Sequence, residues 1–185
     1  MKAYVLSPIL FATIFLNTTP SFAEQHVPKI TQLEVEAQQQ KWCNSLVAIS
    51  QTYLKDGQLA AKKMASDVLD DQYGYKDNTV LFKPTLSQKP QTFRTTKEGA
   101  LAYFVANDEK FPNDTGFALK GWQKCSVEND AFNISNDYAL VMGKVYLEDG
   151  KGKITTVDKT WGFVKDKNSK LKIVVHHSSL EYQPS

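Results

Sequence analysis

The residues of this sequence best suited to chemistry lie in one short stretch near its end. Ile173 to Tyr182 reads as an apolar strand that runs into two histidines and two serines, His176-His177-Ser178-Ser179. Because strand side chains alternate between faces, His176 shares one face with Ser178, and His177 shares the other with Ser179. Either pair could place an imidazole, which can accept a proton near pH 7, beside a hydroxyl. The alternative is a structural role, in which these residues form hydrogen bonds at a strand end.

Bulk composition describes an ordinary globular protein. The chain has 185 residues, of which 42% are hydrophobic and 23% charged, and its net charge is +2. This predicts a single domain, and the dispersed lysines give no basic patch for nucleic acid or a membrane surface.

The N-terminus has the pattern of a signal peptide. Lys2 precedes a mostly apolar segment, Val5 to Leu16, and Ser21-Phe22-Ala23 has the form of a cleavage site. We therefore expect residues 1–23 to be removed near Ala23, residues 24–185 to form the mature domain, and the protein to be periplasmic or secreted. The apolar segment is too short to span a bilayer, so we expect no membrane anchor in the mature form.

Two cysteines, Cys43 and Cys125, occur in the chain. In an oxidising compartment they could form one disulfide, which would stabilise the fold by about 4 kcal/mol in the chain-entropy model. Two buried, unpaired thiols are the alternative. We favour the unpaired thiols, because the pattern gives no information on the distance between a helical and a strand residue.

The elements that must position the terminal stretch follow from hydrophobic spacing. Apolar residues three and four apart predict helices over 32–55 and 58–69, which Asp56-Gly57 separates, and a third helix to Val105 capped by Thr95 or Thr96. A short strand over 79–84 and an extended segment over 92–95 come between them. Alternating patterns predict strands over 117–133, 138–147, 154–165 and 171–182, joined by hairpin turns. Helices followed by hairpins predict an α+β domain, with the helices on one face of a curved antiparallel sheet and a cavity between the two layers.

Several ordered motifs give the sequence a family resemblance over about residues 35–182. They are Tyr73-Gly-Tyr, Thr79-Val-Leu-Phe-Lys-Pro-Thr85, Glu98-Gly-Ala-Leu-Ala-Tyr-Phe-Val105, Phe111-Pro with Gly116-Phe-Ala, and the terminal His-His-Ser-Ser. Together they resemble the iota-class carbonic anhydrases. That resemblance implies a cone-shaped nuclear-transport-factor-like fold, shared with the association domain of calcium/calmodulin-dependent kinase II, and a homodimer formed through the sheet.

The resemblance also implies a site for carbon dioxide and bicarbonate. The family's pocket threonine corresponds to Thr85, its tyrosine to Tyr103, and its histidine and serine to the terminal tetrad. We expect His176 and Ser178 to be the catalytic pair. The other register stays open, because an apolar face made by Leu171, Ile173 and Val175 would place His177 and Ser179 inside as substrate-binding residues.

A metal-free mechanism fits these residues. Catalytic zinc usually has three protein ligands, and this chain has only three histidines, of which two adjoin on one strand and His26 is near the N-terminus. Relatives are described both as metal-free and as using manganese or zinc, so the resemblance leaves these metals open. We expect carbon dioxide to lie against Phe82, Phe104 and Val174, which are substrate-binding candidates. Thr85, Tyr103 and Ser178 would orient a water, and His176 would accept its proton.

Two other functions use the same fold. An isomerase or dehydratase would need a buried carboxylate with a raised pKa, for which Asp137 and Asp158 are candidates by position only. A non-catalytic module would use the pocket to bind a small ligand or to hold an oligomer.

Overall fold

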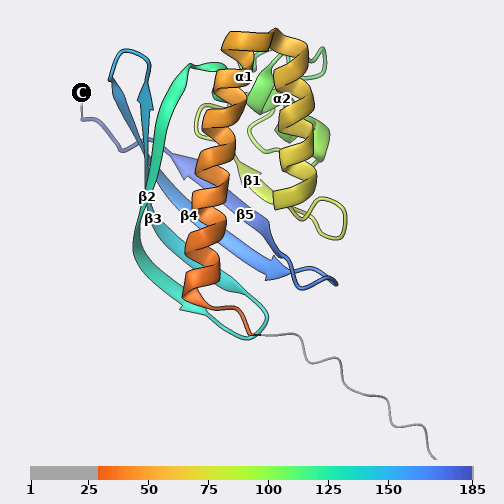
Figure 1. Ribbon diagram of the computed structural model, residues 1–185, viewed down its shortest axis with the longest axis vertical. Helices are drawn as coiled ribbons and strands as arrows, with labels where there is room; N and C mark the ends of the chain where they lie inside the picture. The colour runs from red at the N-terminus through yellow and green to blue at the C-terminus, as the bar shows by residue number, and fades with distance from the viewer. Residues whose placement is uncertain (1–28, 185) are drawn as a thin grey trace, which may run out of the picture.

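The computed structural model describes residues 29–184, beginning with a long, broken helix. The signal segment over residues 1–23 and His26 lie outside the described residues. Helix α1 (Gln32–Gln72) starts with a capping box, in which Thr31 Oγ1 accepts from the Glu34 amide and the Glu34 carboxylate accepts from the Thr31 amide. Gly57 has φ 82° and ψ −175°, which breaks α1 into two antiparallel arms (Figure 1). The predicted break at Asp56-Gly57 is confirmed, although the second arm ends at Gln72 rather than residue 69.

Helix α2 (Lys97–Val105) follows the loop after the first strand, and Thr96 caps it by accepting from the Gly99 amide. The sheet contains β1 (Leu81–Lys83), β2 (Trp122–Ile134), β3 (Ala139–Asp149), β4 (Ile154–Lys165) and β5 (Leu171–Ser179), in the order β1-β5-β4-β3-β2. Strands β2 to β5 form the predicted antiparallel hairpins. Strand β1 instead pairs in parallel with β5, a pairing that the hydrophobic pattern does not predict.

One predicted strand starts at the wrong residue. Phe117–Leu119 is a single turn of 3-10 helix, so β2 starts five residues later than predicted. Residues 92–95 form a loop, in which the Arg94 amide donates to the Phe82 carbonyl without forming a strand.

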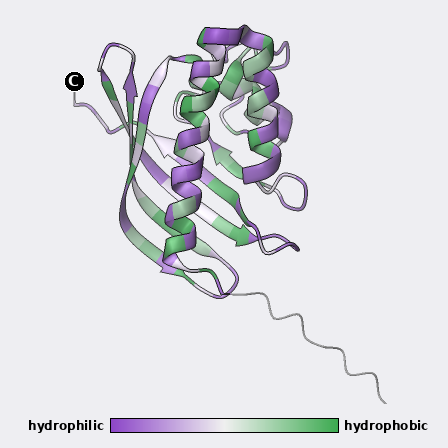
Figure 2. Ribbon diagram, in the orientation of Figure 1, coloured by the Kyte–Doolittle hydropathy of each residue, from purple (hydrophilic) through white to green (hydrophobic). Residues whose placement is uncertain are grey.

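Both arms of α1 and helix α2 cover the same face of the curved sheet, so the α+β architecture is confirmed (Figure 1). Hydrophobic segments lie along the strands and the helix faces that meet, whereas the turn between the α1 arms is hydrophilic (Figure 2). The interior face of the sheet contributes Val145, Val157, Trp161 and Phe163 to the core. Among residues 29–184, none of the helices has the length and apolar character that a bilayer crossing would need.

A β-bulge in β5 decides which side chains of this strand face the core. Gly162 pairs with Val175, but Phe163 pairs with Ile173, so Val174 is an extra residue without a partner. Gly162 allows this close approach, because a Cβ there would lie 2.6 Å from Val175 Cγ2. The bulge reverses the alternation, and both Ile173 and His176 are therefore buried although they are three residues apart.

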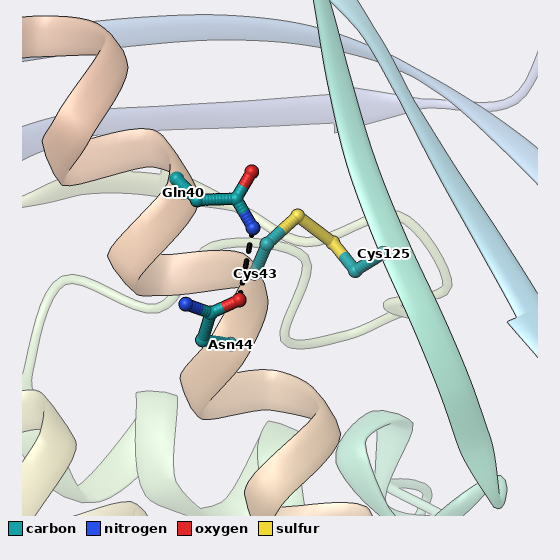
Figure 3. Close-up of a disulfide and its surroundings, with 4 residues drawn as sticks. All are labelled: Gln40, Cys43, Asn44 and Cys125. Carbon is teal, nitrogen blue, oxygen red and sulfur yellow. Dashed lines mark hydrogen bonds between the residues drawn. A yellow bond between two sulfur atoms is a disulfide. The ribbon is translucent and has the colours of Figure 1, made fainter.

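Cys43 and Cys125 form a disulfide between α1 and β2, so the preference for unpaired thiols is wrong (Figure 3). Their Cα atoms are 5.2 Å apart, within the usual range for a disulfide. Cys43 lies on the buried face of α1 that packs across β2, a pairing of helix and strand positions that local sequence patterns do not specify.

Candidate active site

His176 is buried in an aromatic cage, which we define as Trp42, Tyr73, Phe82 and Trp161. The distances between its ring centroid and theirs are 5.5, 5.9, 4.3 and 4.9 Å, respectively. The cage joins α1, the residue after α1, β1 and β4 around one residue of β5. The His176 side chain is only 2% exposed, and burial is the largest cause that lowers its pKa well below 6.5.

A chain of polar contacts runs through the cage. Trp42 Nε1 donates to Tyr73 Oη over 2.9 Å, and Tyr73 Oη lies 2.8 Å from His176 Nδ1. His176 Nε2 contacts Lys159 Nζ, from the neighbouring strand β4. Both ring nitrogens of His176 are therefore engaged by protein groups, so the imidazole cannot contact a water directly without breaking one of these contacts.

Ser178 lies on the same face of β5 as His176. Its side chain is 1% exposed, and among residues 29–184 its Oγ has no hydrogen-bond partner. Ser178 is directly opposite Lys159 in the β4–β5 pairing. A buried hydroxyl without a partner is costly, so this one is available to a small polar ligand.

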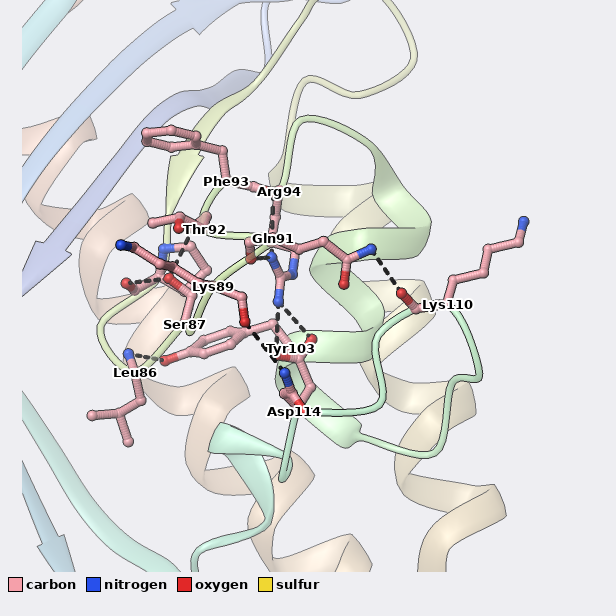
Figure 4. Close-up of polar contacts among 12 residues, drawn as sticks. Leu86, Ser87, Lys89, Gln91, Thr92, Phe93, Arg94, Tyr103, Lys110 and Asp114 are labelled. Carbon is pink, nitrogen blue, oxygen red and sulfur yellow. Dashed lines mark hydrogen bonds and ion pairs between the residues drawn. The ribbon is translucent and has the colours of Figure 1, made fainter.

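Tyr103 and His176 both pack against the Phe82 ring, and Thr85 hydrogen-bonds to Tyr103. Tyr103 packs edge-on against Phe82 at 5.7 Å, and the Leu86 amide lies 3.4 Å from Tyr103 Oη (Figure 4). Burial raises the pKa of Tyr103, while hydrogen bonds from Leu86 and Thr85 oppose that shift. Thr85 follows β1 by two residues, and β1 ends where Lys83 pairs with His177. It therefore lies at the same end of the sheet as Ser178.

A buried ion pair fixes the loop that carries Thr85. Arg94 Nη2 donates to both carboxylate oxygens of Asp114, over 2.8 and 3.0 Å (Figure 4). The two side chains are 2% and 4% exposed, and the guanidinium lies over the Phe111 ring at 4.7 Å. Beside this loop, a cleft of about 230 Å³ reaches Tyr103 and is lined by Leu86, Asp114, Phe117 and Lys120, among others.

Some predicted site residues lie elsewhere. His177 and Ser179 are on the outer face of the sheet, so they do not share the buried site with His176 and Ser178. Val174 is half-buried at the bulge, where its Cγ1 approaches Gly74, and it does not belong to the cage. Phe104 does line the interior, with ring centroids 5.8 Å from Phe82 and 6.4 Å from Tyr73.

Four neighbours of the predicted histidine were not expected from the sequence: Trp42, Tyr73, Lys159 and Trp161. For Lys159 a signal existed, because it alternates with Val157 and Trp161 on the apolar side of the predicted strand over 154–165. The contacts of Trp42 and Tyr73 with His176 span 134 and 103 positions of chain, and no local pattern specifies them.

Metal-ligating side chains do not converge in the part of the chain that the structure describes. No group of three or more histidine, cysteine, aspartate or glutamate residues in 29–184 is placed to hold a metal ion. The interior site is instead made of hydroxyls, an imidazole, an amine and aromatic rings.

The sequence matches both a protein family and a curated protein that are described as metal-independent carbonic anhydrases. The model of a family described as metal-independent carbonic anhydrase matches residues 33–180. A metal-independent carbonic anhydrase from Nostoc sp. (strain PCC 7120 / SAG 25.82 / UTEX 2576) is 54% identical over 154 residues, which cover 83% of this chain and 75% of that protein.

Two solved structures define the fold. The iota-carbonic anhydrase from a cyanobacterium, in complex with bicarbonate, has 53% identity and a TM-score of 0.83, covering 84% of this chain and 95% of that one. A protein described as a calcium/calmodulin-dependent protein kinase II association domain, from Xanthomonas campestris, has 19% identity and a TM-score of 0.50, covering 88% of this chain and 100% of that one. The latter similarity concerns the fold alone, and it agrees with the fold shared with that association domain which the family resemblance implies.

Proposed function

Because this chain belongs to the metal-independent carbonic anhydrase family, we propose that it catalyses the reversible hydration of carbon dioxide to bicarbonate without a metal. The family match over residues 33–180 carries this proposal. The buried site supports it, since an apolar cage suits carbon dioxide and the unpartnered Ser178 hydroxyl suits a bicarbonate oxygen.

The hydroxyls of Thr85, Tyr103 and Ser178 orient the attacking water and stabilise the charge that develops on the bicarbonate oxygens. Phe82 and Phe104 form the apolar wall and exclude bulk water, which strengthens these hydrogen bonds. The raised pKa of Tyr103 keeps its hydroxyl protonated, so it remains a donor. His176 takes part in proton transfer through its two ring contacts rather than as a free base.

Stopped-flow measurement of carbon dioxide hydration tests the function. We expect the parent to exceed the buffer rate and to keep its activity after exhaustive chelation with EDTA. Thr85→Ala and Tyr103→Phe should each lower the rate by about tenfold or more, because each removes a hydrogen bond to the transition state. A parent rate equal to that of buffer, or activity that EDTA abolishes and one metal ion restores, would contradict the proposal.

The isomerase or dehydratase alternative loses its candidate bases. Asp137 is exposed, and Asp158 is on the outer face, where it binds Lys144. Asp114 is a buried carboxylate, but it is bound bidentately by Arg94. We therefore do not retain this alternative.

We further propose that the protein acts in a periplasm or outside the cell, after cleavage of a signal peptide near Ala23. The Cys43–Cys125 disulfide supports an oxidising compartment. Mass spectrometry of the protein exported by its native host should give a chain that starts near Glu24. A full-length chain retained in a reducing compartment would contradict the proposal.

A homodimer formed through the outer face of the sheet is the expected assembly. Leu140 and Met142 of β3 are apolar and 42% and 59% exposed on that face, which a second copy would cover. Light scattering should give twice the monomer mass for the parent and the monomer mass for Met142→Lys. A monomeric parent would contradict this assembly.

A further inference from the structure

Lys159 is a buried lysine whose amine does not form an ion pair with a carboxylate among residues 29–184. Its side chain enters the aromatic cage, where Nζ is 4.4 Å from the centroid of Trp42 and 4.5 Å from that of Trp161. The residues that flank it on the neighbouring strands are Gly143 and Ser178, which are small. The sheet thus leaves room for this side chain beside His176.

The donor and acceptor roles along the polar chain favour an uncharged Lys159 amine. The indole N–H of Trp42 can only donate, so it occupies one lone pair of Tyr73 Oη. The Tyr73 hydroxyl then donates to His176 Nδ1; the opposite direction would leave a buried phenol hydrogen without an acceptor. The imidazole proton is therefore on Nε2, which faces Lys159 Nζ. An ammonium there would set donor against donor, whereas a neutral amine accepts.

Desolvation acts in the same direction, since burial lowers the pKa of Lys159 well below 10.5. The two indole faces favour the cation by about 2 kcal/mol each when desolvated, and they offset only part of the effect of burial, because the pKa of Lys159 is still lowered. A buried neutral lysine is poised to act as a base.

We propose that Lys159 is the terminal acceptor of the proton released on hydration, reached through Tyr73 and His176. This inference rests on the proposed carbonic anhydrase function. As the water oxygen bonds to carbon dioxide, the water's proton moves to Tyr73 Oη, the Tyr73 proton moves to His176 Nδ1, and the Nε2 proton moves to Lys159 Nζ.

The step is balanced at each group. A C–O bond forms, one C=O π bond becomes the bicarbonate oxyanion, and Lys159 becomes an ammonium. Tyr73 and His176 stay neutral, and the imidazole changes tautomer. The same transfers in reverse deliver the proton for the dehydration of bicarbonate. A void of about 10 Å³, lined otherwise by apolar side chains of α1, lies beside Trp42, Tyr73 and Phe104 at the Tyr73 end of the chain.

We expect the titration of Lys159 to set the pH profile of the hydration rate, because the neighbouring tyrosines stay neutral. His176 and Tyr73 are the titratable side chains of the chain itself, and Tyr75 and Tyr103 lie beyond Tyr73. Burial raises the pKa of all three tyrosines, so they stay neutral. On the outer face of the strands, Asp158 is paired with Lys144, and His177 acts on His176 to lower its pKa.

The charge of Lys159 can be measured without an assay of activity. In protein labelled with ¹⁵N-lysine, the Nζ resonance of Lys159, assigned by its loss in Lys159→Arg, should show a neutral amine in the resting enzyme and titrate well below 10.5. An ammonium throughout the range from about pH 6 to pH 9 would overturn the proposal, whether or not the protein hydrates carbon dioxide.

Activity gives the second test. Lys159→Met and Lys159→Arg should lower kcat by about 10²-fold or more, and Lys159→Met should lose the rise of the parent's hydration rate with pH. Tyr73→Phe should lower kcat similarly while Lys159 remains neutral by NMR. A Lys159→Met enzyme with the parent's rate and pH profile, or an active Lys159→Arg, would overturn the proposal.

Lys165→Met is the matched control. Lys165 is on the same strand with a side chain only 4% exposed, but its Nζ binds Glu34 at 2.8 Å. This variant should keep the parent's kcat and pH profile once its folding is confirmed by circular dichroism. An equal loss of activity in Lys165→Met would overturn the assignment to Lys159, and a parent no faster than buffer would reject the function rather than the charge of Lys159.

Discussion

The two faces of the β4–β5 pair carry nearly the same residue types in very different surroundings. The inner face has Lys159, His176 and Ser178, and the outer face has His177 and Ser179 beside Lys144 of β3. Each inner residue of β5 is adjacent in sequence to its outer counterpart. Composition and motif therefore cannot separate the two sets.

The two lysines show what the surroundings change. Lys144 forms ion pairs with Asp158 and Glu181, which raise its pKa. Lys159 has aromatic rings and an imidazole instead, and burial lowers its pKa well below the ordinary value. Lys144 is partly exposed to solvent and paired, whereas Lys159, His176 and Ser178 are desolvated, and the Ser178 hydroxyl has no partner among residues 29–184. This difference, rather than residue type, assigns the chemistry to the inner face.

Replacing each of the two histidines in turn should give the largest difference in hydration rate. His176→Gln interrupts the contact between Tyr73 and Lys159, so the hydration rate should fall by about 10²-fold or more. His177→Gln changes an exposed side chain and should leave the rate close to that of the parent. Stopped-flow assays on both variants check this pair. Equal losses in the two, or a loss confined to His177→Gln, would reverse the assignment of the faces.

The serines should give a smaller difference in the same direction. Ser178→Ala removes one hydroxyl that can bind bicarbonate, and it should raise KM for bicarbonate and lower the rate by about tenfold. Ser179→Ala should change neither. The measurement is bicarbonate dehydration at several substrate concentrations. The idea fails if the two variants are indistinguishable.

The last prediction concerns stability and its dependence on pH. The pKa of Lys159 is lower in the folded than in the unfolded chain, so between these two values the unfolded state binds more protons and stability rises with pH. Lys159→Met removes this contribution to the pH dependence of the free energy of unfolding. The variant should be more stable than the parent at neutral pH, by an advantage that shrinks by at most about 1.4 kcal/mol per pH unit as the pH rises toward 10.5.

Urea titrations at several pH values measure that advantage. Lys144→Met is the comparison, because its pKa is raised rather than lowered, and it should give no gain at neutral pH. A pH-independent difference between parent and Lys159→Met would mean that Lys159 has the same charge in both states.

Local chemistry determined much of this protein. Hydrophobic spacing gave the helices, the break at Gly57 and the order of the hairpins, since these depend on residues close in sequence. The ordered motifs gave the family. They also predicted Thr85 and Tyr103 as site residues, and the structure places Thr85 next to Tyr103 and Tyr103 against Phe82.

Only the tertiary structure decided the neighbours of the terminal histidines. The apolar face of β5 argued for burying His177, and the bulge at Val174 reverses that parity, because one extra residue moves every later side chain to the other face. The Cys43–Cys125 disulfide joins residues 82 positions apart, and the contacts of Trp42, Tyr73 and Lys159 with His176 are likewise long-range. The sequence supplied an imidazole and a hydroxyl on one strand; packing against α1 and β4 desolvated them and placed an amine at their side.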